Sequence, residues 1–354
     1  MDTNNTNVMP EAKPEYAVPE KVYDLKYGYI EPKKLDKKRV RGKVSVLSFI
    51  PIIMFVSMYS LVFISQIVIG ITTGYDTVKF SVSSGIPTTV YFALNAMVSA
   101  VATCLPFFIY AIASKEITMN EVIRTHRVKF SDGILMVLMG VGICLLANFP
   151  ANWLGDFVEG FGFTVSESSS PSANTLEQIL LSVIGVAVIP PIMEEFAFRG
   201  VILGTLRRFG DWFAIILSSL IFGFMHMSVT GIPFAIISGF VLGYVYVITG
   251  NIWVNIGIHA LNNLISVGMD LSNDHLSETA ADILNGGIFI GFIVLGIAAI
   301  VVLVVKKKLH IRLFRPKMMI NGWNKFVCTV INPGFICFML LCLGYVSLTL
   351  FGII

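Results

Sequence analysis

Three apolar stretches of the sequence carry polar side chains at positions where a membrane-spanning helix would hold them deep in the bilayer. They are Glu194, Glu195 and Arg199 in the first stretch, His226 in the second, and His259 and Asn263 in the third. At 1.5 Å per helical residue, Glu194 lies about 20 Å from the helix end at Arg207. By the same measure His226, His259 and Asn263 lie about 12 to 22 Å deep. Because a charged side chain at mid-bilayer costs about 2.5–3.5 kcal/mol on insertion scales, three helices that place such groups in one layer indicate a functional site.

These residue types favour hydrolysis of a bond inside the bilayer. A carboxylate such as Glu194 beside the imidazole of His226 can act as a general base on water. A second imidazole, His259, with Asn263 one turn further on, offers hydrogen-bond donors for a developing oxyanion. The alternative is that Glu194, His226 and His259 hold a divalent metal such as zinc, with an open position for water. The sequence leaves open whether the site needs a metal or is metal-independent.

Local spacing separates the two neighbouring carboxylates. Glu195 and Arg199 are four residues apart and can pair on one helix face, whereas Glu194 points about 100° away and needs another partner. Pro190 and Pro191 precede them and remove backbone donors, so the helix should kink or open there. Because neighbouring groups or water must then satisfy the freed carbonyls, we expect a water-filled pocket beside Glu194.

The order and spacing of these residues resemble a known set of motifs. Glu194-Glu195-x-x-x-Arg199, Phe222-x-x-x-His226 and His259-x-x-x-Asn263 resemble the motifs of the CAAX-prenyl-protease-2-like family, also called CPBP or Abi. The resemblance covers residues 175–270. It implies a membrane endopeptidase of the CAAX protease or bacteriocin-processing type, with its site in a cavity that opens toward the cytosol. Eukaryotic relatives cleave the last three residues from prenylated CAAX proteins, whereas bacterial relatives are linked to peptides, leader sequences or immunity-related targets.

The resemblance also implies a role for each motif residue. Glu194 would activate the attacking water with help from His226. His259 and Asn263 would stabilise the tetrahedral intermediate. Glu195 and Arg199 would hold the site together. Both metal-dependent and glutamate-dependent mechanisms are argued for the family, so the metal question stays open.

The elements that must position these residues are membrane-spanning helices. Of the 354 residues 55% are hydrophobic and 13% are charged, and the mean hydropathy is +0.80. Since a soluble globular protein carries about 25% charged residues, this composition excludes an ordinary cytosolic enzyme, a secreted disulfide scaffold and a disordered chain. Nine stretches are candidates to cross about 30 Å of hydrocarbon: 44–71, 87–113, 133–149, 179–206, 212–229, 233–249, 252–269, 283–305 and 326–351.

The sequence therefore predicts an all-α polytopic membrane protein, a helical bundle of about eight to nine transmembrane segments with an intramembrane active-site cavity. We expect four parts within one membrane domain: a basic, disordered or surface-bound cytoplasmic tail (1–43), N-terminal transmembrane segments (44–172), a CPBP-like catalytic core (173–270) and C-terminal transmembrane segments (271–354). Residues 166–172 are expected to form a flexible loop.

Charge predicts which side of the membrane each end faces. With nine alternating spans, 24 of the 25 Lys and Arg residues, all but Lys79, fall on the side of the N-terminus. The positive-inside rule then places the N-terminus in the cytoplasm. The general look of the tail favours a bacterial cell membrane as the location.

Two other functions stay open. One is a catalytically silent membrane scaffold or immunity protein on the same fold, although all three motifs are intact. The other is a proton-coupled transporter that uses Glu194 and His226 as a relay, but only one marked helix break, at Pro190-Pro191, is evident where such transporters have paired breaks. The expected partners are membrane lipid and a peptide or membrane-protein substrate, with no nucleic acid. The oligomeric state is not predicted.

Overall fold

A computed structural model of the chain describes residues 20–73, 86–114, 117–165, 171–309 and 313–353. Several features of the sequence analysis lie outside these residues: positions 1–19 of the expected tail, most of the 166–172 loop, and Lys79.

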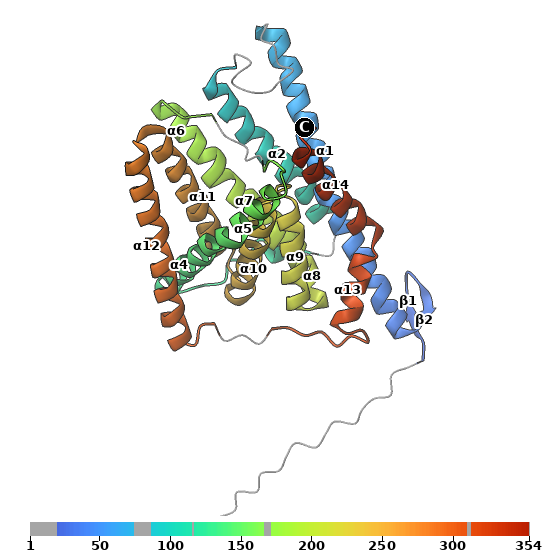
Figure 1. The fold of residues 1–354 in the computed structure, drawn as a ribbon. Helices are drawn as coiled ribbons and strands as arrows, with labels where there is room; N and C mark the ends of the chain where they lie inside the picture. The colour runs from blue at the N-terminus through green and yellow to red at the C-terminus, as the bar shows by residue number, and fades with distance from the viewer. Residues whose placement is uncertain (1–19, 74–85, 115–116, 166–170, 310–312, 354) are drawn as a thin grey trace, which may run out of the picture.

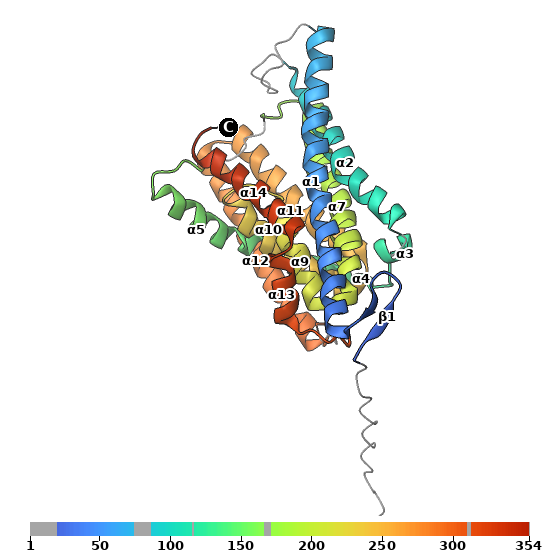
Figure 2. The ribbon, with the colours of Figure 1, turned by 90° about the vertical axis from the view of Figure 1, so that its right-hand side faces the viewer.

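The described residues form a bundle of helices with one small antiparallel hairpin, in which β1 (Val22–Asp24) pairs with β2 (Gly28–Ile30) (Figure 1). The longer helices are α1 (Pro32–Thr73), α2 (Thr88–Ala113), α4 (Phe130–Leu146), α5 (Asn148–Glu159), α9 (Asp211–Phe224), α10 (Gly231–Thr249), α11 (Ile252–His275), α12 (Glu278–Val305) and α14 (Pro333–Leu350). The short helices α3 (Met119–Val122) and α13 (Gly322–Val330) join them. Figure 2 shows α1 and α2 side by side along one edge of the bundle.

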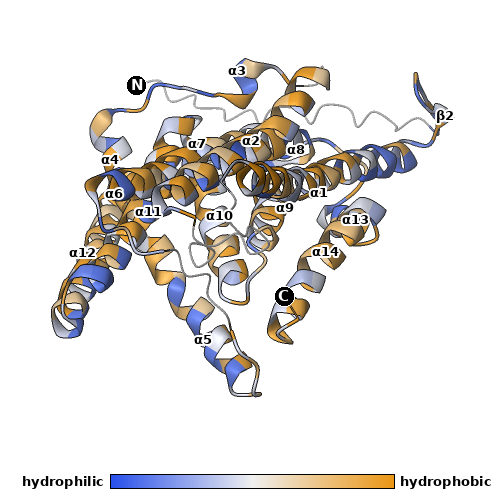
Figure 3. Cartoon of the chain, turned by 90° about the horizontal axis from the view of Figure 1, so that it is seen from above, coloured by the Kyte–Doolittle hydropathy of each residue, from blue (hydrophilic) through white to orange (hydrophobic). Residues whose placement is uncertain are grey.

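The prediction of an all-α polytopic membrane protein is confirmed. Within the described residues, seven helical stretches are long and apolar enough to cross a membrane. The two other predicted spans are α9 and α11. α9 is apolar but has only 14 residues, and the 24 residues of α11 include the polar side chains of His259 and Asn263. Figure 3 shows apolar residues along most of the bundle and hydrophilic ones at the start of α1. The chain is an integral membrane protein.

The first and last spans differ from their predicted limits. α1 begins at Pro32, so residues 20–43 form the hairpin and the first turns of a helix rather than a disordered segment. Lys and Arg are good helix formers, which lets the helix extend beyond the bilayer. The predicted span 326–351 is two helices, because Asn332 ends one and caps the next by accepting hydrogen bonds from the backbone of Gly334 and Phe335.

The fourth span, which carries Glu194, is a helical rod whose hydrogen-bond register changes along its length. Its parts are α6 (Leu176–Ser182), the π-helical η2 (Val183–Val188), α7 (Ile189–Glu194), the π-helical η3 (Glu195–Leu203), α8 (Gly204–Leu206) and the 3₁₀ turn η4 (Arg207–Phe209). Pro190 and Pro191 occupy the first turn of α7, between the two π segments. The kink or opening predicted at the prolines is therefore a change from α-helical to π-helical hydrogen bonding on either side of α7. Such π segments are frequent at functional sites.

α9 and α10 approach closely beside this rod. A Cβ on Gly239 would lie 3.2 Å from the Cα of Ser219, so only glycine fits the approach without displacement. The carbonyl of the buried Gly239 accepts a hydrogen bond from Arg199 of the fourth span, where the site forms.

Candidate active site

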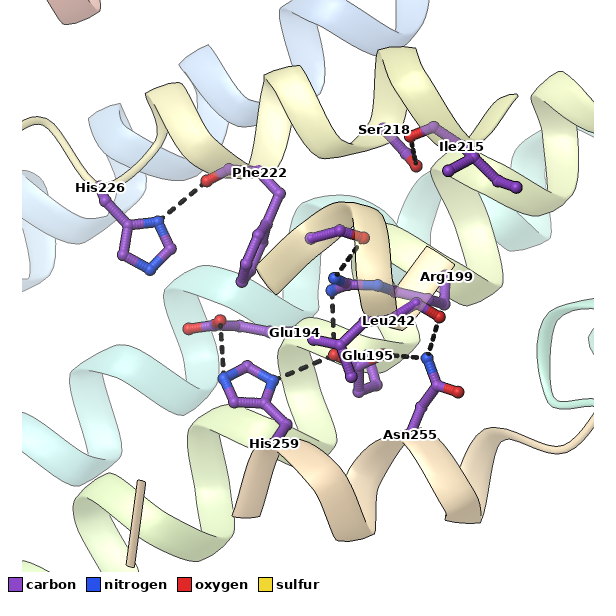
Figure 4. Close-up of polar contacts among 11 residues, drawn as sticks. Glu194, Glu195, Arg199, Ile215, Ser218, Phe222, His226, Leu242, Asn255 and His259 are labelled. Atoms are coloured by element: carbon purple, nitrogen blue, oxygen red, sulfur yellow. Dashed lines mark hydrogen bonds and ion pairs between the residues drawn. The ribbon is translucent and has the colours of Figure 1, made fainter. Parts of the chain in front are cut away.

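The predicted ion pair of Glu195 and Arg199 forms the buried inner end of the site (Figure 4). Arg199 Nη1 donates to Glu195 Oε1 at 2.9 Å, and both side chains are almost completely buried. Arg199 Nη2 donates to the carbonyl of Gly239 at 3.3 Å, and the guanidinium lies 4.5 Å from the ring centre of Phe222. Since a buried ion pair needs further partners to offset its desolvation, these contacts make the pair tenable inside the bundle.

Two residues of α11 complete the shell around Glu195. The Nδ1 of His259 lies 3.0 Å from Glu195 Oε1, and Asn255 Nδ2 donates to Glu195 Oε2 at 3.2 Å. Asn255 also donates to the carbonyl of Leu242 at 2.6 Å, which ties α11 to α10. Asn255 was not among the predicted site residues; its position four residues before His259, on the same helix face, is the signal that could have identified it.

Glu194 points away from the Glu195–Arg199 ion pair. Its carboxylate faces Nε2 of His259, the ring nitrogen that does not contact Glu195. The distance from His259 Nε2 to Glu194 Oε2 is 3.7 Å, and the Glu194 side chain is 16% exposed. One imidazole thus lies between two carboxylates. Because Glu195 accepts at Nδ1, the proton of a neutral His259 stays there and the lone pair of Nε2 faces Glu194.

His226 stands at the open edge of the site, at the end of α9. Its Nδ1 donates to the carbonyl of Phe222 at 2.9 Å, which directs Nε2 outward, and the side chain is exposed. The Phe222 ring packs edge-on against both imidazoles, with centroids 4.9 Å from His226 and 6.0 Å from His259. In Figure 4 the His226 ring and the Glu194 carboxylate lie on the same side of Phe222. The direct partner of Glu194 is His259, whereas the resemblance implied His226.

Asn263 supplies a hydrogen-bond donor to a backbone carbonyl that the two prolines leave without one. Its Nδ2 donates to the carbonyl of Val186 at 2.9 Å. In an α-helix that carbonyl would accept from residue 190 and in a π-helix from residue 191, and both are proline. Asn263 therefore supplies the donor that neither register can offer.

A cavity of about 520 Å³ lies beside these groups, between α5, α11 and α12. His226, Asn263 and Val186 lie on its wall, together with further polar residues, namely Asn148, Asn152, Asn262 and Ser266. On α11 the wall residues run from Asn262 to Met269, across the middle of the helix, and on α12 the wall includes Phe289.

The predicted metal set does not fit this arrangement. Within the described parts of the chain, no three His, Cys, Asp or Glu side chains are grouped so that they could hold a metal ion. The chemistry considered below therefore uses protein groups alone.

Comparison with known proteins agrees with this site. Residues 176–265 match the family described as Type II CAAX prenyl endopeptidase Rce1-like. Over 162 residues the chain is 30% identical to "Putative membrane peptidase YdiL" of Bacillus subtilis (strain 168), a match that covers 44% of this chain and 66% of that protein. No solved structure matches the chain significantly. The matched residues include the whole site from Glu194 to Asn263, so the chain carries a segment that is similar to the Rce1-like type II CAAX prenyl endopeptidases, and it spans slightly less than two thirds of the Bacillus subtilis protein.

Proposed function

We propose that this protein is an intramembrane endopeptidase that hydrolyses a peptide bond of a peptide or membrane-protein substrate with water activated at Glu194. The observation that carries the proposal is the position of His259 between the carboxylates of Glu194 and Glu195. The family match and the name of the Bacillus subtilis relative support a peptidase.

In the proposed reaction Glu194 removes a proton from water as the water oxygen attacks the scissile carbonyl carbon. His259 Nε2 shares that proton, and the resulting imidazolium is stabilised by Glu195, which is itself held by Arg199. The positive charge near the tetrahedral intermediate offsets its oxyanion. The carbon–nitrogen bond then breaks, and the proton passes from Glu194 to the departing amine.

Water and substrate would reach Glu194 through the cavity. Its wall carries four asparagines and Ser266, and a polar cavity of this volume holds water. His226 Nε2 points outward at the edge of this cavity and would accept a hydrogen bond from the attacking water. The cavity could receive an extended peptide segment from the side of α5.

The test compares wild type with Glu194→Gln and, as a matched control, Glu177→Gln, which changes an exposed glutamate in the first turn of α6. Each purified protein receives a fluorogenic peptide library and a prenylated CAAX peptide in detergent, with and without a chelator. Loss of a general base should lower the rate about 10²–10⁴-fold. We expect Glu177→Gln to keep wild-type activity and the chelator to have no effect. Equal activity of Glu194→Gln and wild type would contradict the proposed role of Glu194.

A further inference from the structure

Two cavities of opposite character adjoin at the end of the bundle where α1 begins. The first, here called the cationic cavity, has a volume of about 570 Å³ and is lined by the hairpin, the first turns of α1 and residues 316–318. The second, here called the apolar groove, has a volume of about 520 Å³ and runs between α9 and α13. Phe209 and Pro316 line both cavities. A ligand with a charged head and an apolar tail could therefore occupy both at once.

The cationic cavity carries six basic side chains against two acidic ones. The acidic ones are already engaged: Asp24 accepts from Arg39 at 2.7 Å, and Asp36 accepts from the backbone of Met319 at 2.6 Å. Lys38 lies 4.6 Å from the ring centre of Tyr27, and neither Lys38 nor Lys317 has a carboxylate partner within the described chain. The cavity thus presents excess positive charge, which suits a phosphate group.

The apolar groove lies open along the side of the bundle. Trp212, Ile216 and Phe326 line it and are 41%, 49% and 50% exposed. Its wall toward the cationic cavity is held in place by the paired backbones of Asp211 and Phe314, which lie 3.1 Å apart from nitrogen to oxygen. In a bundle that spans a membrane, an exposed apolar surface of this kind faces acyl chains, and here it adjoins the cationic cavity.

We propose that the cationic cavity and the apolar groove together bind one anionic phospholipid, with its phosphate among the lysines and an acyl chain along α9. The adjoining groove favours a lipid over a free phosphate ion, because a phosphate would use the cationic cavity alone. The start of the α1 span beside the lysines also suits the depth of a lipid headgroup. This proposal is independent of the peptidase reaction.

The test measures binding of phosphatidylglycerol to the purified full chain by native mass spectrometry, with phosphatidylcholine and inorganic phosphate as comparison ligands. Lys38→Gln/Lys317→Gln removes two charges from the cavity, and Lys33→Gln/Lys129→Gln removes two exposed charges elsewhere. Ile216→Trp fills the groove, and Ile297→Trp adds the same bulk on the exposed face of α12.

We expect phosphatidylglycerol to bind more tightly than phosphatidylcholine. Lys38→Gln/Lys317→Gln should weaken its binding about 30-fold, and Ile216→Trp should weaken it several-fold, with both controls close to wild type. Thermal unfolding checks that each variant is folded. Three results would overturn the proposal: wild-type affinity in Lys38→Gln/Lys317→Gln, an equal loss in Lys33→Gln/Lys129→Gln, or inorganic phosphate that competes as well as the lipid. Unchanged lipid affinity in Ile216→Trp would overturn the assignment of the groove.

Discussion

The two sides of the site are built differently although their carboxylates are neighbours in the chain. On the closed side, Glu195 is fully buried and each of its oxygens has a polar partner. On the open side, Glu194 is partly exposed, and the Nε2 atom of His259 stands 3.7 Å from its carboxylate. A satisfied buried network makes a rigid support, whereas a loosely held carboxylate beside a cavity has room for water and substrate. The closed side therefore stabilises the fold around Glu195, and the open side holds the carboxylate that we propose to act on water.

The largest loss of stability is expected when one partner of the ion pair on the closed side is removed. Arg199→Met should lower the free energy of unfolding by about 3–5 kcal/mol, because it leaves the carboxylate of Glu195 buried without its main partner. Thermal or denaturant unfolding in detergent measures the loss. The double variant Glu195→Leu/Arg199→Met should recover part of it, since no unpaired charge remains. A double variant less stable than Arg199→Met would contradict this account.

The same amide substitution in the two neighbouring glutamates sharpens the contrast. Glu195→Gln should cost about 3–5 kcal/mol, because it leaves the guanidinium of Arg199 buried without a carboxylate partner. Glu194→Gln should change stability by less than about 0.5 kcal/mol, as expected for a side chain without such contacts. Unfolding midpoints of the two variants, measured side by side, check this. Equal destabilisation would remove the distinction between the two sides.

Asn263 is an exception that tests the boundary between the two sides. It faces the open cavity, yet it satisfies the Val186 carbonyl that Pro190 and Pro191 leave without a donor. Asn263→Ala should therefore cost about 1–3 kcal/mol for the unsatisfied carbonyl. Asn262→Ala, at the next position on the same cavity wall, is the matched control and should cost less. If both variants lose the same stability, the bond to Val186 contributes nothing specific.

The smallest effect on stability is expected at His226, on the open side. His226→Gln should change the free energy of unfolding by less than about 0.5 kcal/mol, because the side chain is exposed and hydrogen-bonds to the carbonyl of Phe222, only four residues earlier in the chain. Its peptidase rate should nevertheless fall, since Gln lacks an imidazole nitrogen to orient the attacking water. Unfolding and peptide cleavage measured on the same preparation separate the two effects. A large loss of stability in His226→Gln would show that His226 supports the fold, as the residues of the closed side do, and would contradict this prediction.

Much of the architecture was predictable from local sequence. Eight of the nine predicted spans each correspond to one helix or helical rod and the ninth to two helices, because hydropathy and helical period are properties of short segments. The pairing of Glu195 with Arg199 followed from their four-residue spacing. The start of α1 and the division before α14 were missed, because a charged helix can extend past the bilayer and a cap at Asn332 interrupts an apolar run.

The sequence alone determined the membrane helices, the pairing of Glu195 with Arg199 and the freed carbonyls before the prolines, since all of these depend on neighbours along one chain segment. Only the tertiary structure decided that His259 lies between the two carboxylates, that Asn255 joins Glu195 to α10, and that Asn263 reaches Val186. These contacts join residues up to 77 positions apart. They depend on how α9, α10 and α11 cross the fourth span, which is set by packing between helices and not by the order of residues within one segment.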